Sequence, residues 1–450
     1  MACCAADVVV ARLMKDLKAE ATSIFLDTLK SIQLDSLIRK KLALEGDRLL
    51  VDGKSFDLGD YREVVLVGLG KASASMGAAL EAILGDRLTR GVLVTNCKSR
   101  VKTKSELIVA GHPLPNENSL KAGELIIQLI ESCGSDSLVL FAISGGGSSL
   151  VELPLSSAIT LADLRELNRA LITCGAAIRE INIVRKRLSR IKGGRLGYLA
   201  RHCHSIAMFV SDVNPGDVRS IASNPLLPED ASQDEFEGIL ERYGLTDKLP
   251  VSIRNLIRSG EMPKLPGEWR GEDREPINVL LLENADAVST ASRIAAARGY
   301  RVEVDPAPAE GPYTAVADAM VGRLIKLRGE SAEKVCLVSG GEVSCSVTGR
   351  GFGGRNQDFV LYCAARLAAY GLSGRIAVLS CGTDGIDGNS SAAGAVADAG
   401  VISAGHKLGL DASSFVARNS STSFLCETGA LIVTGPTGNN VRDLTILLIN

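Results

Sequence analysis

The chain of 450 residues has few aromatic residues, almost no net charge and no long hydrophobic run. Aromatic residues make up 4% of it and Trp269 is the single tryptophan, so stacking platforms for nucleic-acid bases are not expected. The formal net charge of −2 gives no electrostatic reason to expect a nucleic-acid partner either. No apolar run approaches the roughly 20 residues that cross a bilayer, so we predict no membrane association.

The N-terminus lacks the features of a targeting segment. It has no basic start, and Asp7, Asp16 and Glu20 are acidic residues that a transit peptide avoids. The eleven cysteines include no Cys-x-x-Cys pair, and several lie in apolar runs, as Cys336 does. Scattered apolar cysteines are typical of a reduced protein, so we expect a cytoplasmic location. A homo-oligomer is compatible with the composition but not required by it.

Histidine is scarce, with four residues in the chain. His202-Cys203-His204 resembles a metal-binding cluster, but adjacent positions face different ways on a helix or a strand. We therefore do not expect a metal there. His112 and His406 stand alone in the sequence.

Short β-branched runs alternate with helical patterns on both sides of a polar segment, 263–276, which contains three prolines. Alternation of this kind is typical of largely parallel sheets covered on both faces. We predict an α/β fold with two domains, 1–262 and 277–450, joined by a linker at 263–276. Predicted strands are 64–67, 92–95, 107–110, 138–143, 206–210, 279–282, 301–304, 335–338, 376–379 and 431–433. Predicted helices cover the chain up to about 44 and then 72–84, 120–131, 163–179, 285–298, 315–327 and 358–370.

Six of the predicted strands run into loops rich in Gly, Ser, Thr and Asp. In open parallel sheets, ligands bind beyond the carboxyl ends of the strands. The loops are therefore candidate binding segments: 68–73, 144–149, 211–217, 339–342, 382–388 and 434–438.

The segment 338–358 is the most informative of these regions. Four glycines in six residues, from Gly349 to Gly354, precede Arg355-Asn356-Gln357-Asp358 and an apolar-periodic stretch. A helix that begins near Arg355 would point its free N–H groups into the loop, and the guanidinium adds a charged donor fork. We predict an anion site that uses Gly353, Gly354, Arg355, Asn356 and Gln357. The alternative is a tight hairpin followed by an ordinary helix start.

Gly68-Leu69-Gly70-Lys71 resembles a phosphate loop without satisfying its pattern. A P-loop requires Gly at position 65 and Ser or Thr at position 72, which are Val65 and Ala72. A dinucleotide fingerprint requires Gly at position 73, which is Ser73. A lysine next to Gly70 at a strand-to-helix turn can still balance charge on a transferring phosphoryl group. The alternative is a surface lysine on a first helical turn.

Three glycines and three serines at 144–149 form a second candidate anion site, since successive backbone N–H groups bind anions well. Its alternative is a flexible loop. The members are Ser144, Gly145, Gly146, Gly147, Ser148 and Ser149.

Two acidic pairs, Asp212 with Asp217 and Asp384 with Asp387, lie in loops that contain glycine. They could hold Mg²⁺ on phosphate oxygens or accept a hydroxyl proton, although aspartate is common in purely structural turns. The basic run 182–187 is either a solvated helix face or a grip for carboxylate or phosphate. These features predict a small, multiply anionic substrate, and both phosphoryl transfer and a redox reaction on an organic acid fit them.

Taken together and in order, the motifs resemble the class II glycerate kinases, whose C-terminal region is the MOFRL domain. The resemblance spans about 8–446. It rests on the segments 68–73, 111–116, 144–150, 182–194, 211–217 with 221–223, 340–342, 353–357, 382–388 with 392–395, and 434–438 with 440–441. Some relatives of this family carry the name hydroxypyruvate reductase.

The resemblance implies ATP-dependent phosphorylation of D-glycerate, most often to 2-phosphoglycerate, with Mg²⁺. It implies a Rossmann-like N-terminal domain, a C-terminal MOFRL domain and an active site in the cleft between them. The family's functional lysine and arginine fall on Lys71 and Arg355. We expect both to stabilise the transferring phosphoryl group, with Asp212 as the residue that orients the 2-hydroxyl and Asp384 as the metal ligand; the two aspartates could exchange these roles.

The chain departs from the family pattern at four places. Asn224 replaces a usual Gly, Asp358 a usual Glu and Arg187 a usual His, and the acidic residue expected before a serine is absent at Asn419-Ser420. Asn tolerates a left-handed backbone, so the loop at Asn224 is expected to survive.

Two other functions fit the pattern less well. One is an NAD(P)H-dependent hydroxypyruvate reductase, against which the missing third glycine and the lack of a placed histidine base both count. The other is a non-catalytic sensor of sugar acids.

Overall fold

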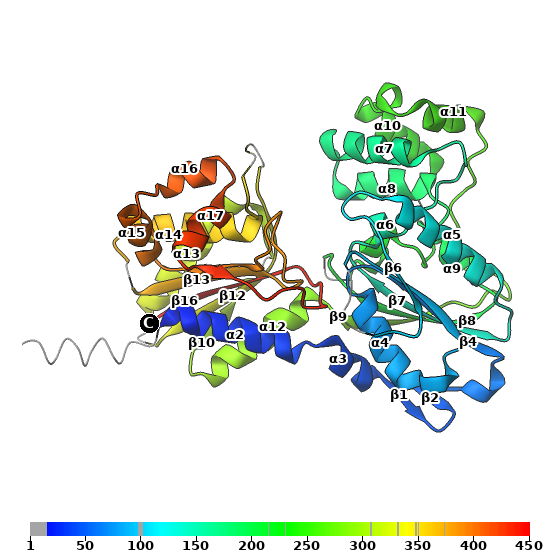
Figure 1. Ribbon diagram of the computed structural model, residues 1–450, viewed down its shortest axis with the longest axis horizontal. Helices are drawn as coiled ribbons and strands as arrows, with labels where there is room; N and C mark the ends of the chain where they lie inside the picture. The colour runs from blue at the N-terminus through cyan, green and yellow to red at the C-terminus, as the bar shows by residue number, and fades with distance from the viewer. Residues whose placement is uncertain are drawn as a thin grey trace, which may run out of the picture. The chain divides into compact units, whose positions relative to one another are not determined.

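The structure is a computed structural model that describes residues 16–97, 102–214, 216–229, 231–306, 308–330, 333–346, 349, 351–372 and 374–450. It contains two compact units, each built around its own sheet (Figure 1). The first is Leu34–Leu282, and the second joins the segment up to Gln33 to Glu283–Asn450. The prediction of two α/β domains is confirmed, although this division falls at 282/283 and groups the first helix with the C-terminal unit.

The sheet of the first unit has six strands, and all of its strand pairs are parallel. The spatial order is β6 (Glu106–Val109), β5 (Arg90–Thr95), β4 (Glu63–Leu69), β7 (Ser137–Ser144), β8 (His204–Val210) and β9 (Ile277–Leu282). Every residue of the central strands β4 and β7 is buried, as expected for parallel strands covered on both faces. The carboxyl ends of β4, β7 and β8 therefore lie next to one another at one edge.

Helices cover both faces of this sheet. On one face, α4 (Ser73–Leu84) packs over Leu93 so closely that Gly77 has no room for a side chain. The other face carries α5 (Glu117–Glu131), α6 (Gly147–Leu150) and α9 (Arg195–Leu199). A separate core joins α7 (Leu161–Thr173), α8 (Ile178–Leu188), α10 (Gln233–Arg242) and α11 (Val251–Ser259). Figure 1 shows these four helices as a group beyond the sheet.

Two predictions for the first unit are wrong. The helix predicted over 163–179 is divided into α7 and α8, because Gly175 adopts a left-handed backbone (φ 83°) between them. The helical prediction up to about 44 extends too far. It covers α3 (Leu34–Lys41) and then enters a small antiparallel sheet of β1 (Leu42–Glu45), β2 (Arg48–Val51) and β3 (Lys54–Asp57).

The predicted linker 263–276 packs onto the first unit. Leu265 is buried in the same core as α8 and α10. Arg195 donates hydrogen bonds to the carbonyl oxygens of Pro263 and Lys264, at 3.1 and 3.2 Å. Within the described part of the chain, no helix is long and apolar enough to span a membrane.

The sheet of the second unit is mixed. Its order is β10 (Arg301–Val304), β12 (Val335–Ser344), β16 (Asp443–Ile449), β13 (Ile376–Gly382), β14 (Gly394–Ala397) and β15 (Leu431–Ile432), and β11 (Ala309–Pro312) also pairs with β12. The strand β16, which was not predicted, runs antiparallel to both β12 and β13. The run predicted to end at 338 continues to Ser344, because the backbone of Gly340 and Gly341 stays in register with β16 and the residues from Gly341 to Ser344 pair with β11.

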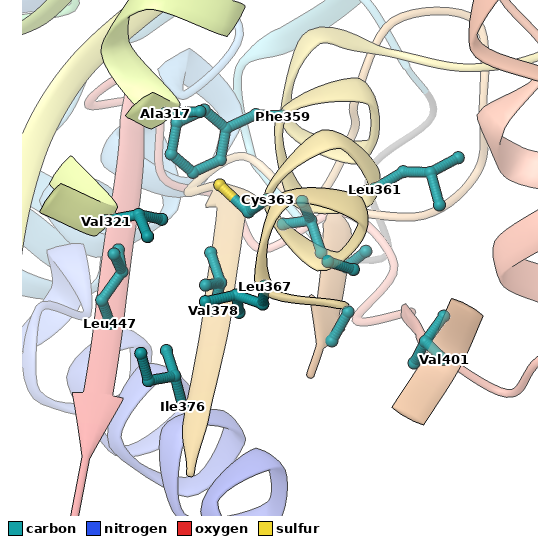
Figure 2. Packing of buried hydrophobic residues seen from close by; sticks show 14 of the residues in the cluster. Ala317, Val321, Phe359, Leu361, Cys363, Leu367, Ile376, Val378, Val401 and Leu447 are labelled. Atoms are coloured by element: carbon teal, nitrogen blue, oxygen red, sulfur yellow. The ribbon is translucent and has the colours of Figure 1, made fainter. Parts of the chain in front are cut away.

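Four helices enclose the second sheet. The helices α2 (Leu17–Ser31) and α12 (Asn284–Ala297) pack together against it, and α13 (Tyr313–Glu330) and α14 (Arg355–Ala369) cover the other face. Figure 2 shows Phe359, Cys363 and Leu367 of α14 beside Val378 of β13, with Leu447 of β16 close by. The short helices α15 (Gly400–Lys407), α16 (Ala412–Ala417) and α17 (Ser421–Glu427) follow β14.

The register of β16 has a direct consequence for the site. Asp443 pairs with Gly341, three residues before the carboxyl end of β12, and with Gly382 at the carboxyl end of β13. An antiparallel strand thus begins where its two neighbours end, so its first side chain joins the loops at that edge.

Candidate active site

The turn that carries Lys71 is locked against the turn that follows β7. The Lys71 N–H donates to the carbonyl oxygen of Gly145 at 2.9 Å, and the Ala72 N–H donates to Ser144 Oγ at 3.0 Å. Gly70 has φ 125°, and a Cβ there would lie 2.2 Å from Ser144 Oγ. Only glycine fits this approach. Lys71 therefore lies at a strand-to-helix turn, as predicted, beside the Gly-rich segment 144–149.

His112 meets Lys71 at this Gly-rich turn. Gly146 adopts a left-handed backbone (φ 81°), and a Cβ on it would lie 3.2 Å from Lys71 Cγ and 3.3 Å from His112 Nε2. The two side chains thus approach the same point from different strand-end loops. Reasoning from the sequence left His112 without a role because it stands alone there; its place in a loop after a predicted strand was the available signal.

Ser148 links the turn to helix α8 on its other side. Its hydroxyl lies 2.7 Å from Ser223 Oγ, which donates to Asn182 Oδ1 at 3.2 Å. Ala222, Ser223 and Asn224 have φ values of 51°, 60° and 53°, so three consecutive non-glycine residues are left-handed. Such backbone costs about 1–3 kcal/mol per residue and is concentrated at functional sites.

Asn224 adopts the left-handed backbone that was expected of it. Its side chain accepts a hydrogen bond from the Leu227 N–H and donates one to the Leu227 carbonyl oxygen, both at 3.0 Å. These two bonds are not available to the glycine usual at this position. The departure at Asn224 therefore keeps the loop conformation and adds contacts.

The basic run 182–187 is not a solvated helix face. Lys186 and Arg187 are buried, and they contact Glu229 and Gln233 respectively. Arg187 also lies over the Phe236 ring of α10, 5.9 Å from its centroid. The departure at Arg187 therefore belongs to the packing of α8 against α10.

Asp212 follows β8 at the same edge of the sheet as Lys71 and the turn 144–149. It is partly exposed, and the neighbouring Ser211 N–H ties the loop to the Leu282 carbonyl oxygen at 2.8 Å. Asp217 accepts a hydrogen bond from the Ser220 hydroxyl, which is an ordinary turn contact. The catalytic role of Asp212 stays a prediction.

In the second unit, Arg355 begins α14 as predicted and forms a fork with Asp443. Arg355 Nε donates to Asp443 Oδ2 at 2.6 Å, and Nη2 donates to Asp443 Oδ1 at 2.9 Å and to Glu342 Oε1 at 2.8 Å. Burial alone would lower the pKa of Arg355, but these carboxylates raise it. Asp443 escaped prediction because it starts the unpredicted strand β16.

The N-terminus of α14 is occupied by a carboxylate of the chain itself. Asp387 Oδ1 accepts two hydrogen bonds from Asn356, one from its backbone N–H and one from its side-chain amide. Asp387 Oδ2 accepts the same two kinds of bond from Gln357, and the four distances are 3.0–3.2 Å. Ser380 and Thr422 donate to the two amide oxygens, both at 2.6 Å. A Cβ on Gly354 would lie 2.3 Å from Asp387 Cγ. These contacts favour a structural role for Asn356 and Gln357, so their ligand role stays a prediction.

Asp384 lies at the end of β13, next to Asp443. The point that a Cβ on Gly382 would take is 3.1 Å from Asp384 Oδ1 and 3.5 Å from Asp443 Oδ1. Asp384 Oδ1 also accepts from the Ile386 N–H at 3.0 Å. The described residues contain no group of three or more metal-ligating side chains. Mg²⁺ commonly takes one or two carboxylates and completes its shell with water and phosphate oxygens, so this pair suits it.

A pocket of about 480 Å³ opens beside Arg355. Asp358, one helical turn after Arg355, also lines it, and its Oδ1 finds no hydrogen-bond partner among the described residues. Burial raises the pKa of Asp358. The remaining lining residues are Val343, Ser344, Cys345, Gly351, Gly353, Gly354, Gly388, Asn389 and Asn419.

The titration of Asp387 predicts how the stability of the protein depends on pH. Burial and the nearby Asp443 raise the pKa of Asp387 to about 6, against the hydrogen bonds from Asn356 and Gln357. An unfolded aspartate titrates near about 3.9. Between about pH 4 and 6 the folded chain therefore keeps a proton that the unfolded chain has lost, so this contribution to stability falls as pH rises, by about 3 kcal/mol in all.

The comparison that checks this prediction is wild type against Asp387→Asn, by urea unfolding between pH 4.5 and 7. Asparagine does not titrate, and groups that do not interact with Asp387 cancel in the difference. The free energy of unfolding of wild type minus that of the variant should fall across this range. A difference that rises with pH would instead mean that the folded pKa lies below the unfolded one.

Two family models match the chain. The domain of unknown function DUF4147 matches residues 20–258, and the MOFRL family matches residues 335–443. The chain is 34% identical to a D-glycerate 2-kinase of Thermotoga maritima over 86% of this chain and 90% of that protein. It is 35% identical to a protein of Agrobacterium vitis that bears a provisional hydroxypyruvate reductase name, over 86% of this chain and 99% of that protein.

A solved structure supports the same relationship. The crystal structure of glycerate kinase from Thermotoga maritima aligns with this chain at a TM-score of 0.79 and 30% identity. The alignment covers 96% of this chain and 99% of that one.

Proposed function

We propose that this chain, which belongs to the MOFRL family of glycerate kinases and is itself a glycerate kinase, transfers the γ-phosphoryl group of ATP to the 2-hydroxyl of D-glycerate. The hydroxyl oxygen bonds to the γ-phosphorus while the bond from that phosphorus to its bridging oxygen breaks. The products are 2-phosphoglycerate and ADP. The hydroxyl proton passes to Asp212.

The observation that carries the proposal is the meeting of Lys71 with the turn 144–149. The Lys71 N–H is bonded to this glycine-rich turn, its Cγ lies beside Gly146, and the contact of Gly70 with Ser144 excludes any side chain at Gly70. The energetic task in phosphoryl transfer is to balance the charge spread over the transferring group. Lys71 supplies a compact positive charge for this, and the backbone N–H groups of the turn supply donors for an anionic substrate group.

Arg355 is the second cation of the proposal, in the other unit. Asp443 and Glu342 hold its Nε and Nη2, and its Nη1 donates to no described residue. Arg355 is also partly exposed and lines the 480 Å³ pocket. The fork to Asp443 thus orients the guanidinium and leaves donors for a phosphate oxygen, with Gly353 and Gly354 giving close access.

Mg²⁺ supplies charge neutralisation on the phosphate oxygens when it is bound. The carboxylates of Asp384 and Asp443, which face one point beside Gly382, are the donors that we assign to it. Asp384 carries the larger share, because both oxygens of Asp443 already accept from Arg355.

One observation favours the alternative function, a hydroxypyruvate reductase, and another counts against it. His112 lies at the turn, so a histidine that could serve as a base is present after all. The position of the third fingerprint glycine is nevertheless filled. Ser73 is buried, and its hydroxyl donates to the Val94 carbonyl oxygen at 2.6 Å. The third glycine of the fingerprint permits close packing of the helix on its strand, so α4 lacks this feature of a dinucleotide site.

A coupled assay tests the proposal. The protein is mixed with D-glycerate, ATP and Mg²⁺, and enolase reports 2-phosphoglycerate directly but 3-phosphoglycerate only after a mutase is added. We expect signal without mutase. Signal only with mutase would identify a 3-kinase. No signal in either case, together with NADH consumption on hydroxypyruvate, would favour the reductase.

A further inference from the structure

Arg185 of α8 is a cation that has no counterion in hydrogen-bond contact among the described residues. It is partly buried, and among the described residues its guanidinium makes no hydrogen bond and no ion pair. Burial lowers the pKa of Arg185, and only attraction from Glu152 opposes this effect. A guanidinium has five N–H donors, and partial burial without protein partners costs them part of their hydration. An anion that bound to the guanidinium would accept hydrogen bonds from these donors and offset the lost hydration.

The nearby carboxylate is already occupied. Glu152 Oε1 accepts from Ser189 Oγ at 2.7 Å and from the Leu153 N–H at 3.0 Å, and Glu152 Oε2 is held by the buried Lys192. The neighbourhood therefore holds the positive charges of Arg185 and Lys192 against the single negative charge of Glu152. One positive charge remains uncompensated, and it belongs to the residue that lacks donor partners.

The position of Arg185 ties it to the catalytic turn twice. Asn182 precedes it by one helical turn, so the two share a face of α8, and Asn182 connects through Ser223 to Ser148. Glu152, whose charge acts on Arg185, follows the short helix α6 that starts in the same turn. Lys71 and His112 approach this turn at Gly146. The turn 144–149 is thus flanked by Lys71 and His112 on one side and by the face of α8 on the other.

We propose that Arg185 binds the carboxylate of the hydroxy-acid substrate, with Asn182 and the Ser148–Ser223 pair holding the adjacent turn in place. This inference rests on the proposed function and deepens it, since it assigns the carboxylate of glycerate to the first unit. A guanidinium fork matches a carboxylate in a bidentate way, which a lysine does not. A phosphate of the nucleotide offers similar oxygens and is the competing source of the anion.

The test compares Arg185→Gln, Arg185→Lys and the control Arg179→Gln in steady-state kinetics. Arg179 lies on the same helix, and its side chain is 84% exposed. We expect Arg185→Gln to raise KM for D-glycerate by about 10- to 100-fold, the loss of one charge-assisted bidentate contact, with KM for ATP unchanged. Arg185→Lys should recover part of the loss. The control should match wild type.

Two further readouts separate binding from structure. Glycerol lacks the carboxylate, so kcat/KM for glycerol should be unchanged in Arg185→Gln. The kcat/KM for D-glycerate should fall, and the ratio of the two values should therefore fall as well. The Tm of Arg185→Gln should equal or exceed that of wild type, because the substitution removes a partly buried charge that has no partner among the described residues. A Tm lowered by several degrees would instead assign Arg185 a structural role.

Other outcomes overturn the inference. A rise in KM for ATP with an unchanged KM for D-glycerate would assign Arg185 to the nucleotide, and unchanged values for both substrates would leave it outside the site. If wild type does not phosphorylate glycerate, the proposed function fails. The inference about Arg185 is then tested separately, by calorimetric titration of D-glycerate into wild type and into Arg185→Gln. Binding to wild type that weakens in the variant would uphold it, and any other result would overturn it.

Discussion

Replacing Lys71 by methionine is expected to lower kcat by about 10³-fold, with KM for both substrates changed much less. Methionine retains the length of the side chain but removes the charge that opposes the negative charge of the transferring group. The backbone contacts that lock the turn, from the Lys71 N–H to Gly145 and from the Ala72 N–H to Ser144, do not involve the ammonium. The fold should therefore be retained, as checked by circular dichroism and Tm.

Lys121→Met is a matched control for this variant. Lys121 lies on α5 of the same unit, its side chain is 61% exposed, and its carboxylate partner is 3.7 Å away. It should retain the kcat of wild type. A Lys71→Met enzyme that turns over within about threefold of wild type would remove Lys71 from the reaction. If Lys71→Met instead loses most of its kcat, the kcat of Lys71→Arg shows whether a positive charge alone is sufficient. A low kcat in Lys71→Arg would mean that the position of the charge also matters.

Replacing Arg355 by glutamine is expected to lower the free energy of unfolding by about 3–5 kcal/mol, in addition to reducing kcat. The side chain of Asp443 is 5% exposed, and Arg355 supplies two of its hydrogen bonds. Removal of the arginine leaves that buried carboxylate without its counterion. The nearby Asp387, whose pKa is already raised by burial and by Asp443, would increase the penalty. Urea unfolding measures the loss.

A double variant separates the structural and catalytic roles of Arg355. In Arg355→Gln with Asp443→Asn, the orphaned charge is gone, so most of the lost stability should return. The kcat value should remain low, because the donors that we assign to the phosphoryl group are still absent. Recovery of kcat together with stability would instead show that Arg355 only maintains the fold.

Several features of this protein could be read from the chain because they depend on neighbours in sequence. The turn at Gly70-Lys71 and the start of α14 at Arg355 follow from local hydrophobic periodicity that stops at glycine. The left-handed backbone of Asn224 was expected for the same reason, since backbone preference is a property of the residue itself. Local signals of this kind predicted the two α/β units, which the structure confirms, and singled out both of the cations on which the proposed function depends.

What only the tertiary structure decided is which strand-end loops meet. Asp443 reaches Arg355 because β16 runs antiparallel between β12 and β13, a pairing that no local pattern specifies. Asp387 fills the N-terminus of α14, although the sequence suggested an open anion site there.

The same holds in the first unit, where His112 comes to the turn at 144–149 and Asn182 is linked to it through Ser223, both from segments that are distant in the chain. Hydrophobic periodicity reports which face of an element is buried, but it does not name the partner against which that face packs. The local pattern therefore determined the elements and the residues with reactive chemistry. The pairing of strands within each sheet determined which strand-end loops of a unit come together.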